Sequence, residues 1–216
     1  MKLKSFGCSF IFGSELHDDG YNSVRATPSQ FTWPALWAQH LGLDYECYAK
    51  PGSGNTRIAE SVLSQIHSKE PAIYVIGWTW IERFDFVQRS GDQWRTLTAW
   101  DTDSVAVNYY RDLHSQYTDK LQSLSMISLT VNHLQASGSK FYMTYMDDLL
   151  WETQYHHSKS MALMQQQLRP VLHNFQGQNF LDWSFARGYP IGIRGKHPLE
   201  AAHRAAFEYV NSVHSF

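Results

Sequence analysis

Residues 72–78, AIYVIGW, form an apolar run that is broken only by one glycine, in a chain of 216 residues. A run without alternating polar residues is typical of a strand that is buried on both faces of a parallel sheet. Two further strand-like stretches precede it, residues 3–9 (LKSFGCS) and residues 44–49 (DYECYA). We therefore expect three strands in the first third of the chain.

Segments with helical periodicity lie between these strands. Residues 32–43 and 56–69 repeat apolar side chains at helical spacing, and Gly42 and Pro71 end the two patterns. The remainder of the chain continues the alternation. Its expected elements are a loop or small aromatic-rich insertion around 85–107, a long helix over 108–136, a strand at 140–147, a helix from 158 to 170, a short fifth strand at 179–183 and a final amphipathic helix over 197–216.

This alternation predicts one domain, 1–216, of the α/β class. The expected architecture is a three-layer α/β/α sandwich around a mostly parallel sheet of about five strands, as in flavodoxin-like proteins. In such sheets ligands bind at the carboxyl ends of the strands.

Composition excludes several classes of function. The chain is 43% hydrophobic and 18% charged, with a net charge of −2 and no basic block, which argues against nucleic acid as a partner. No apolar stretch is long enough to span a bilayer, and the N-terminus has no signal-peptide pattern, so we expect a cytoplasmic protein without a membrane partner. Two cysteines, Cys8 and Cys47, are too few for a disulfide framework and are expected to be buried free thiols.

Ser9 ends the first strand-like stretch, and a parallel sheet brings it to the same edge as the turns PGSGN (51–55) and GWTW (77–80). A serine hydroxyl needs a base within hydrogen-bond reach to act as a nucleophile, and His197 follows the loop 189–196 (YPIGIRGK) near the other end of the chain. Glycines in the turns let backbone N–H groups approach a developing oxyanion. Each of these residues also has a structural interpretation as a turn or helix-cap residue.

The order of these pieces resembles the SGNH, or GDSL-type, hydrolases over nearly the whole chain. Residues 6–13 (FGCSFIFG) resemble the first block of that family, with Cys8 in the position of its Asp and Ser9 in the position of the nucleophile. Residues 51–56 (PGSGNT) are similar to the second block, which implies that Gly54 is the oxyanion glycine.

The last two blocks carry departures from the family pattern. VIGWTW stands where the family has Gly-x-Asn-Asp, so Thr79 takes the place of the oxyanion asparagine. KHPLEAAH resembles the terminal Asp-x-x-His-Pro block and matches His197 as the base, but Arg194 replaces its acid. Either a Ser-His dyad acts with a backbone carbonyl or water orienting the ring, or an acid from elsewhere substitutes, and Asp182 is one candidate.

The resemblance implies a serine esterase or deacylase that cleaves a short acyl ester, such as an acetyl ester of a carbohydrate or similar metabolite, without a cofactor or metal. The alternatives are a non-catalytic carbohydrate- or partner-binding protein on the same fold, and an acyltransferase. Trp78, Trp80, Asn55 and Arg83 are the expected substrate-binding residues, although a surface ion pair is the other interpretation of Arg83. The oligomeric state is left open.

Three further histidines have structural interpretations. His203 lies six residues beyond His197 and therefore on a different face of a straight helix. His156 and His157 are adjacent, which suits joint ligation of a metal poorly because neighbouring helical side chains point about 100° apart.

Overall fold

The structure, a computed structural model, describes residues 1–18, 27–66, 70–89, 91 and 93–214. A five-stranded sheet with the order β2-β1-β3-β6-β7 lies at its centre, and every neighbouring pair of strands in it is parallel. The predicted α/β class and the five-stranded parallel sheet are thereby confirmed. The strands are β1 (Lys2–Phe6), β2 (Asp44–Cys47), β3 (Ala72–Trp78), β6 (Lys140–Tyr145) and β7 (Leu172–His173).

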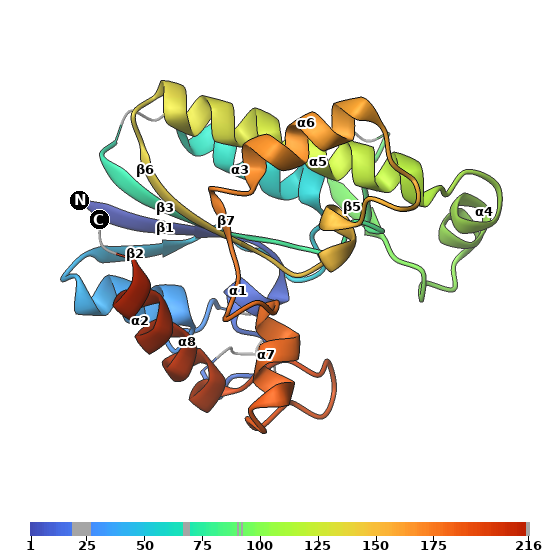
Figure 1. Ribbon diagram of the computed structural model, residues 1–216. Coiled ribbons are helices and arrows are strands. Elements are labelled where there is room, and N and C mark those ends of the chain that lie inside the picture. Colours follow the sequence, from blue (N-terminus) through green and yellow to red (C-terminus); the bar gives the residue numbers. More distant parts are fainter. Residues whose placement is uncertain (19–26, 67–69, 90, 92, 215–216) are drawn as a thin grey trace.

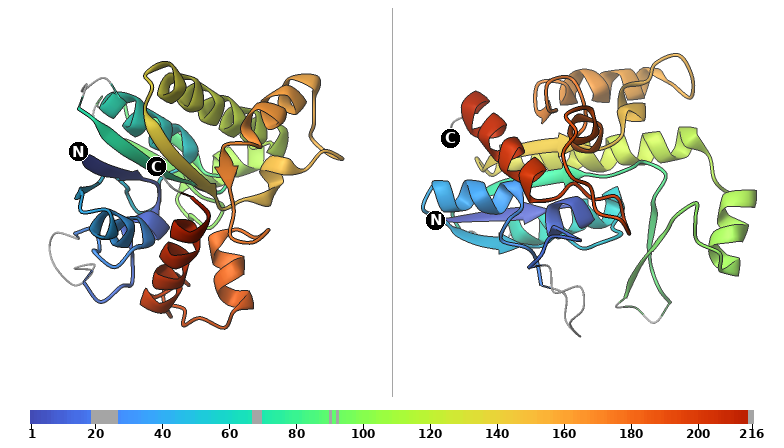
Figure 2. Two further views of the ribbon diagram at one scale, coloured as in Figure 1. Left: turned by 60° about the vertical axis from the view of Figure 1, so that its left-hand side comes forward. Right: turned by 90° about the horizontal axis from the view of Figure 1, so that it is seen from below.

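Helices cover both faces of the sheet, which gives the three layers expected from the sequence (Figure 1). One face carries α2 (Trp33–His40), α7 (Phe180–Ala186) and α8 (Glu200–Val213), and α2 packs against α8 (Figure 2). The other face carries α3 (Asn55–Ile66), α5 (Gln116–Ala136) and α6 (Lys159–Leu168), which pack side by side.

The central strand β3 explains why its sequence is apolar throughout. Ile73 and Val75 belong to the core beneath α2 and α8, whereas Ile76 and Trp78 belong to the core beneath α3 and α5. Successive side chains of a strand point to opposite faces, so a strand with a helical layer on each side buries all of them.

The chain following β1 forms a short helix that the sequence did not predict. This helix, α1 (Ser9–Phe12), has all four of its residues buried and ends at Gly13, which adopts a left-handed conformation. The first strand therefore ends at Phe6 rather than at Ser9.

The segment around 85–107, expected to be a loop or small insertion, contains regular structure. It forms an antiparallel hairpin, β4 (Phe84–Val87) with β5 (Trp94–Leu97), followed by α4 (Ser104–Asp112). Figure 1 shows that the hairpin and α4 lie beyond the carboxyl ends of the central strands, to one side of the sandwich. The carboxylate of Asp103 starts α4 by accepting hydrogen bonds from the N–H groups of Val105 and Ala106.

Two predicted elements were wrong. The long helix over 108–136 is divided, because α4 ends at Asp112 and α5 begins at Gln116. His114, in the turn between them, pairs with Asp119 of α5 (Nε2 to Oδ2, 2.8 Å). The stretch 179–183 is the start of α7, not a strand, because the Asn179 side chain accepts the Asp182 N–H as a helix cap. The fifth strand is instead the two-residue β7.

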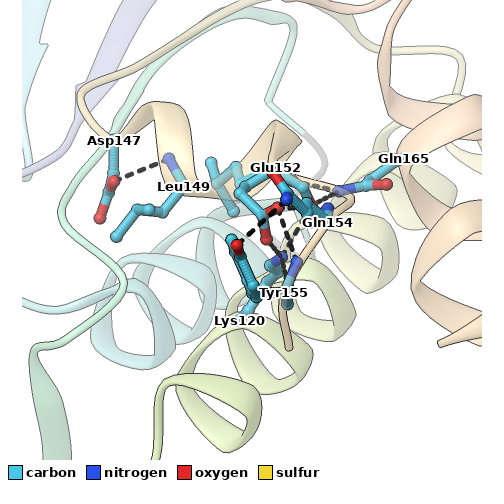
Figure 3. Close-up of polar contacts among 8 residues, drawn as sticks. Lys120, Asp147, Leu149, Glu152, Gln154, Tyr155 and Gln165 are labelled. Carbon is cyan, nitrogen blue, oxygen red and sulfur yellow. Dashed lines mark hydrogen bonds and ion pairs between the residues drawn. The ribbon is translucent and has the colours of Figure 1, made fainter. Parts of the chain in front are cut away.

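The loop after β6 is fixed by buried and partly buried polar contacts (Figure 3). Asp147 accepts the N–H of Ile81 at 3.0 Å and so joins this loop to the one after β3. The Lys120 ammonium donates to the carbonyl of Glu152 at 2.7 Å, to its carboxylate at 3.0 Å and to the carbonyl of Tyr155 at 3.2 Å. Two of the loops at the carboxyl edge are therefore held in a fixed relation.

Two general predictions concern the whole chain. Neither Cys8 nor Cys47 is in a disulfide; Cys8 is buried, while Cys47 is only partly buried. Among the helices of the described residues, none combines the length and the apolar character needed to cross a membrane.

Candidate active site

A cavity of about 430 Å³ lies at the carboxyl edge of the sheet. It brings together residues from α1, from the segment after β3 and from the loop before α8, as expected for a doubly wound sheet. The lining residues are Ser9, Phe10, Trp80, Glu82, Arg83, Trp100, Leu181, Gly195, Lys196 and His197. Ser9 and His197, which lie 188 positions apart in the chain, thus share one cavity.

Ser9 occupies the first position of α1, directly after the extended residue Cys8. Only 7% of its surface is exposed, and it lines the cavity. The first N–H groups of a helix have no acceptor within the helix, so the amide of Ser9 is one of the donors available at this end.

The imidazole of His197 is oriented by a carboxylate that the sequence analysis did not identify. Glu15, six residues after Ser9, lies 2.7 Å (Oε2) from Nδ1 of His197. The His197 ring also packs on Phe10, with 5.0 Å between the ring centroids. The bond to Nδ1 leaves Nε2 as the ring nitrogen that is not engaged by the carboxylate.

Glu15 is held by the backbone as well as by the ring. Its two carboxylate oxygens accept the N–H groups of Arg194 at 2.8 Å, Gly195 at 2.9 Å and His197 at 3.3 Å. Burial alone would raise the pKa of this carboxyl, but the hydrogen bonds from His197 and the three amides lower it to about 2. Glu15 is therefore a carboxylate at neutral pH.

Gly192 and Gly195 leave room for the contact between Glu15 and His197. A Cβ atom on Gly195 would lie 2.3 Å from Cε1 and 2.5 Å from Nδ1 of His197. A Cβ atom on Gly192 would lie 2.5 Å from the Glu15 carboxylate. Only residues without a side chain allow the loop to come this close to the carboxylate and the ring.

The acid that contacts His197 is Glu15, not Asp182 as considered from the sequence. Asp182 is exposed and accepts a hydrogen bond from the Asn179 side chain at 2.7 Å, so it does not orient His197. Arg194 contributes its backbone N–H to Glu15 in place of the side chain that the family pattern has there. The signal in the sequence was an acidic residue close behind Ser9, in a chain that lacks the acid before the histidine.

The N–H of Gly54, predicted to bind the oxyanion, donates to a carboxylate of the protein instead. Its N–H donates to the buried carboxylate of Asp85 at 3.0 Å, and the N–H of Arg57 donates to the same carboxylate at 2.9 Å. Burial raises the pKa of Asp85 above its ordinary value, and the hydrogen bonds from Thr96, Arg57 and Gly54 oppose that shift. The assignment of Gly54 as an oxyanion donor needs correction, because Asp85 on β4 already uses this amide.

Thr79 and Asn55 are also absent from the cavity. The Asn55 side chain accepts the Thr79 N–H at 2.9 Å and donates to the Thr79 carbonyl and the Ser123 hydroxyl at 3.1 Å each. Asn55 therefore braces α3 against the chain after β3 rather than facing a substrate. Thr79 is fully buried, and its hydroxyl has no hydrogen-bond partner among the described residues, so it is not placed to bind an oxyanion in the cavity.

Trp78 is a core residue, not a substrate-binding one. It is completely buried, and its Nε1 lies 3.4 Å from the sulfur of Met143. The alternation of β3 places residue 78 beneath α3 and α5, whereas Trp80, beyond the strand, reaches the cavity.

Trp80 and Arg83 line the cavity, and their predicted role in substrate binding stays a prediction. The indole of Trp80 meets the ring of Phe10 edge to face, with centroids 5.5 Å apart. The Arg83 guanidinium lies over the Trp80 ring, 4.9 Å from its centroid.

His203 has the structural place expected for it. It is buried against Phe180 and accepts the N–H of Trp33 at Nδ1 (3.2 Å), and burial lowers its pKa to about 3. A second imidazole–carboxylate pair, His17 with Glu200 (2.9 Å), joins the chain after α1 to the start of α8 without touching the cavity.

No protein-family model matches this chain. No curated protein matches it in sequence either. Solved structures do resemble it in three dimensions, at low sequence identity.

Three of these structures cover almost the entire chain. TesA matches with a TM-score of 0.57 at 15% identity, over 98% of this chain and 97% of its own. A putative lipolytic protein of the G-D-S-L family from Desulfitobacterium hafniense matches with a TM-score of 0.57 at 10% identity, over 99% of each chain. A catalytic mutant of Axe2, an acetylxylan esterase from Geobacillus stearothermophilus, matches with a TM-score of 0.55 at 11% identity, over 100% of this chain and 94% of its own.

These likenesses and the sheet order define the class of the fold. The chain has the SGNH-type hydrolase fold, which confirms the fold that the sequence resemblance implied.

Proposed function

We propose that this protein is a serine esterase in which Ser9 is the nucleophile, His197 the base and Glu15 the residue that positions the base. One observation carries the proposal. A serine at a helix N-terminus shares a cavity with a histidine whose Nδ1 is bonded to an ionised carboxylate at 2.7 Å. A nucleophile, a base and an orienting acid are the parts from which serine hydrolases are built.

The bond to Glu15 assigns the proton on the ring. An ionised carboxylate accepts only, so Nδ1 of His197 carries a proton and Nε2 has a free lone pair. In the proposed first step Nε2 takes the proton of the Ser9 hydroxyl while Oγ bonds to the ester carbonyl carbon. The imidazolium that forms is stabilised by Glu15 and returns its proton to the departing alcohol.

The N–H of Ser9 is the proposed donor to the oxyanion. The second predicted donor, Gly54, is bonded to Asp85, and the loss of one such donor costs about 10²-fold in rate. We therefore expect slow turnover.

Water then attacks the acyl-enzyme, with His197 as the base again, and releases the acid. None of these steps draws on a cofactor or metal.

A short acyl group on a small alcohol or a sugar is the proposed substrate. The cavity, at about 430 Å³, is of the size that takes a small ligand. Its walls include the aromatic rings of Phe10, Trp80 and Trp100. A structural neighbour described as an acetylxylan esterase supports an acetylated carbohydrate as the first class to test.

The placement of Gly54 and Thr79 favours one alternative, a protein that binds such a ligand without cleaving it. Both residues that the family pattern assigns to the oxyanion are used or buried elsewhere in the structure. No observation favours an acyltransferase over a hydrolase.

Labelling with a fluorophosphonate probe, together with 4-nitrophenyl acetate hydrolysis, tests the proposal. We expect both signals in the native protein and their loss in Ser9→Ala and His197→Ala. Ser212→Ala, which changes an exposed serine of α8, is the control and should behave as the native protein does. A folded native protein that neither reacts nor turns over would support the binding protein instead.

A further inference from the structure

The guanidinium of Arg83 contacts two indole rings, those of Trp80 and Trp100, in the cavity that also holds Ser9 and His197. Its central carbon is 4.9 Å from the centroid of the Trp80 ring and 5.9 Å from that of Trp100. Stacking of this kind holds a guanidinium in place and removes water from the face that meets the ring.

This cation has no acidic partner within the described residues. Its one hydrogen bond there runs from Nη1 to the carbonyl of Ser53 at 3.1 Å. Nε is buried and has no partner in the same set of residues. No carboxylate of the described chain lies within 4.0 Å of the guanidinium, so the surface ion pair considered for Arg83 is not present.

Two other charged side chains line the cavity, one of each sign. Lys196, beside His197, is a second cation in the wall. Glu82 is the acidic residue of the lining. Burial is the largest cause of the raised pKa of Tyr110, and the charge of Glu82 is the next largest. It also raises the pKa of Asp119, which belongs to α5. Within the described residues no ion pair joins Glu82 to Arg83.

We propose that the substrate is an ester that carries a carboxylate, which Arg83 binds while Ser9 attacks the ester carbonyl. The inference rests on the proposed function and names its substrate class. A carboxylate matches the planar fork of a guanidinium, and a charge-assisted bond between them is strong where water is excluded by indoles. The carboxylate belongs either to the acid or to the alcohol part of the ester, and the chemistry at Arg83 is the same.

Two matched pairs of esters distinguish these sources. 3-Acetoxybenzoate and its methyl ester differ by a carboxylate on the alcohol side, and 4-nitrophenyl hemiglutarate and 4-nitrophenyl pentanoate differ by one on the acyl side. The quantity measured is the ratio of kcat/KM for the charged ester to that for the neutral one. We expect this ratio, in at least one pair, to fall about 10- to 100-fold in Arg83→Gln.

The control is Arg204→Gln, which removes the same charge from an exposed position on α8 outside the cavity and should leave the ratio unchanged. Arg83→Lys keeps the charge but not the fork and should give an intermediate ratio. Circular dichroism verifies that each variant is folded. An equal ratio in the native protein and Arg83→Gln for both pairs overturns the inference.

Failure of the proposed function gives a different result. In that case no ester is hydrolysed and Ser9 is not labelled. Calorimetric titration with benzoate and with benzamide then decides the anion site on its own. Binding of benzoate that Arg83→Gln abolishes supports the site, whereas equal binding of the two compounds, or no binding of either, overturns it.

Discussion

Four donors of residues 194–197 meet the carboxylate of Glu15. Its backbone adopts a positive φ of 70°, which is uncommon for a residue with a side chain. The contact joins positions that lie about 180 residues apart, and the packing of two loops creates it. The sequence blocks predicted Ser9 and His197 as site residues. For the acid, the sequence offers only an acidic residue close behind Ser9, which does not reveal that this carboxylate meets the ring.

Glu15→Gln should lower kcat by about 10³- to 10⁴-fold with little change in KM. The amide of Gln would donate to Nδ1, and the ring proton would then lie on Nε2, where it prevents Nε2 from accepting the proton of Ser9. Steady-state kinetics with 4-nitrophenyl acetate provides the measurement.

Glu200→Gln is the matched control for that substitution. Glu200 also accepts a hydrogen bond from an imidazole and from a backbone N–H, both of His17, but it lies outside the cavity. Its variant should retain the native kcat. A comparable loss of kcat in both variants would show that Glu15 acts only by holding the two loops together.

Acid should weaken the contribution of Glu15 to stability. The pKa of this carboxyl is about 2 in the folded protein against an ordinary value of 4.5, so the stabilisation is complete above about pH 4.5 and is lost as the pH falls toward 2. We expect the difference in Tm between the native protein and Glu15→Gln to be constant near neutral pH and to shrink below pH 4.5. A difference that does not vary between about pH 3 and pH 7 contradicts this assignment.

Gly195→Ala should reduce kcat/KM by about 10²-fold, because the new methyl group displaces the His197 ring from its place near Ser9. Gly138→Ala gives the opposite pattern. Gly138 has a φ of 66° and nothing within 4 Å of its Cβ position, so alanine there costs about 1 kcal/mol of stability and no activity. Kinetics and urea unfolding of the two variants, compared side by side, separate the two effects.

At the scale of elements, the strands of the sheet could be predicted better than the segments between them. The apolar run of β3 is enough to predict a central strand, because only a strand covered on both faces buries every side chain. The hairpin β4-β5 and the helix α1 have no such signal. Their conformations depend on caps and on contacts with distant residues, such as Asp85 with the start of α3.

Asp85 attaches the hairpin to α3, and its removal should destabilise the protein. Asp85→Ala leaves three donors without their acceptor, the amides of Gly54 and Arg57 and the hydroxyl of Thr96 (2.5 Å), and should lower the free energy of unfolding by about 2 kcal/mol. Asp85→Asn should lose less, because burial penalises the charge of the native carboxylate and the amide keeps one acceptor.

Urea unfolding of these variants gives the two free energies. Asp112→Ala, which removes a carboxylate from an exposed pair with Arg111, is the control and should leave the free energy of unfolding almost unchanged. If Asp85→Ala is as stable as the control variant, the hairpin is not held through this contact.

At the scale of the molecule, the two hydrophobic cores share one sheet. Alternate side chains of β3 belong to the core on either face, so neither core exists without the strand. The single domain predicted from the sequence should therefore unfold in one transition. Far-ultraviolet circular dichroism and tryptophan fluorescence should give the same Tm, since tryptophans lie in both cores; two separate midpoints would require two folding units.

The acid and the base of the candidate site reside on separate loops, and this has a consequence for motion. If residue 194 carried the acid, the loop before α8 could swing outward as a rigid body with its acid and histidine still bonded. With the acid at residue 15, any outward swing of residues 194–197 breaks all four bonds to the carboxylate together. In the proposed mechanism, opening of the loop therefore also separates Glu15 from His197, so Ser9 is activated only while the loop is closed.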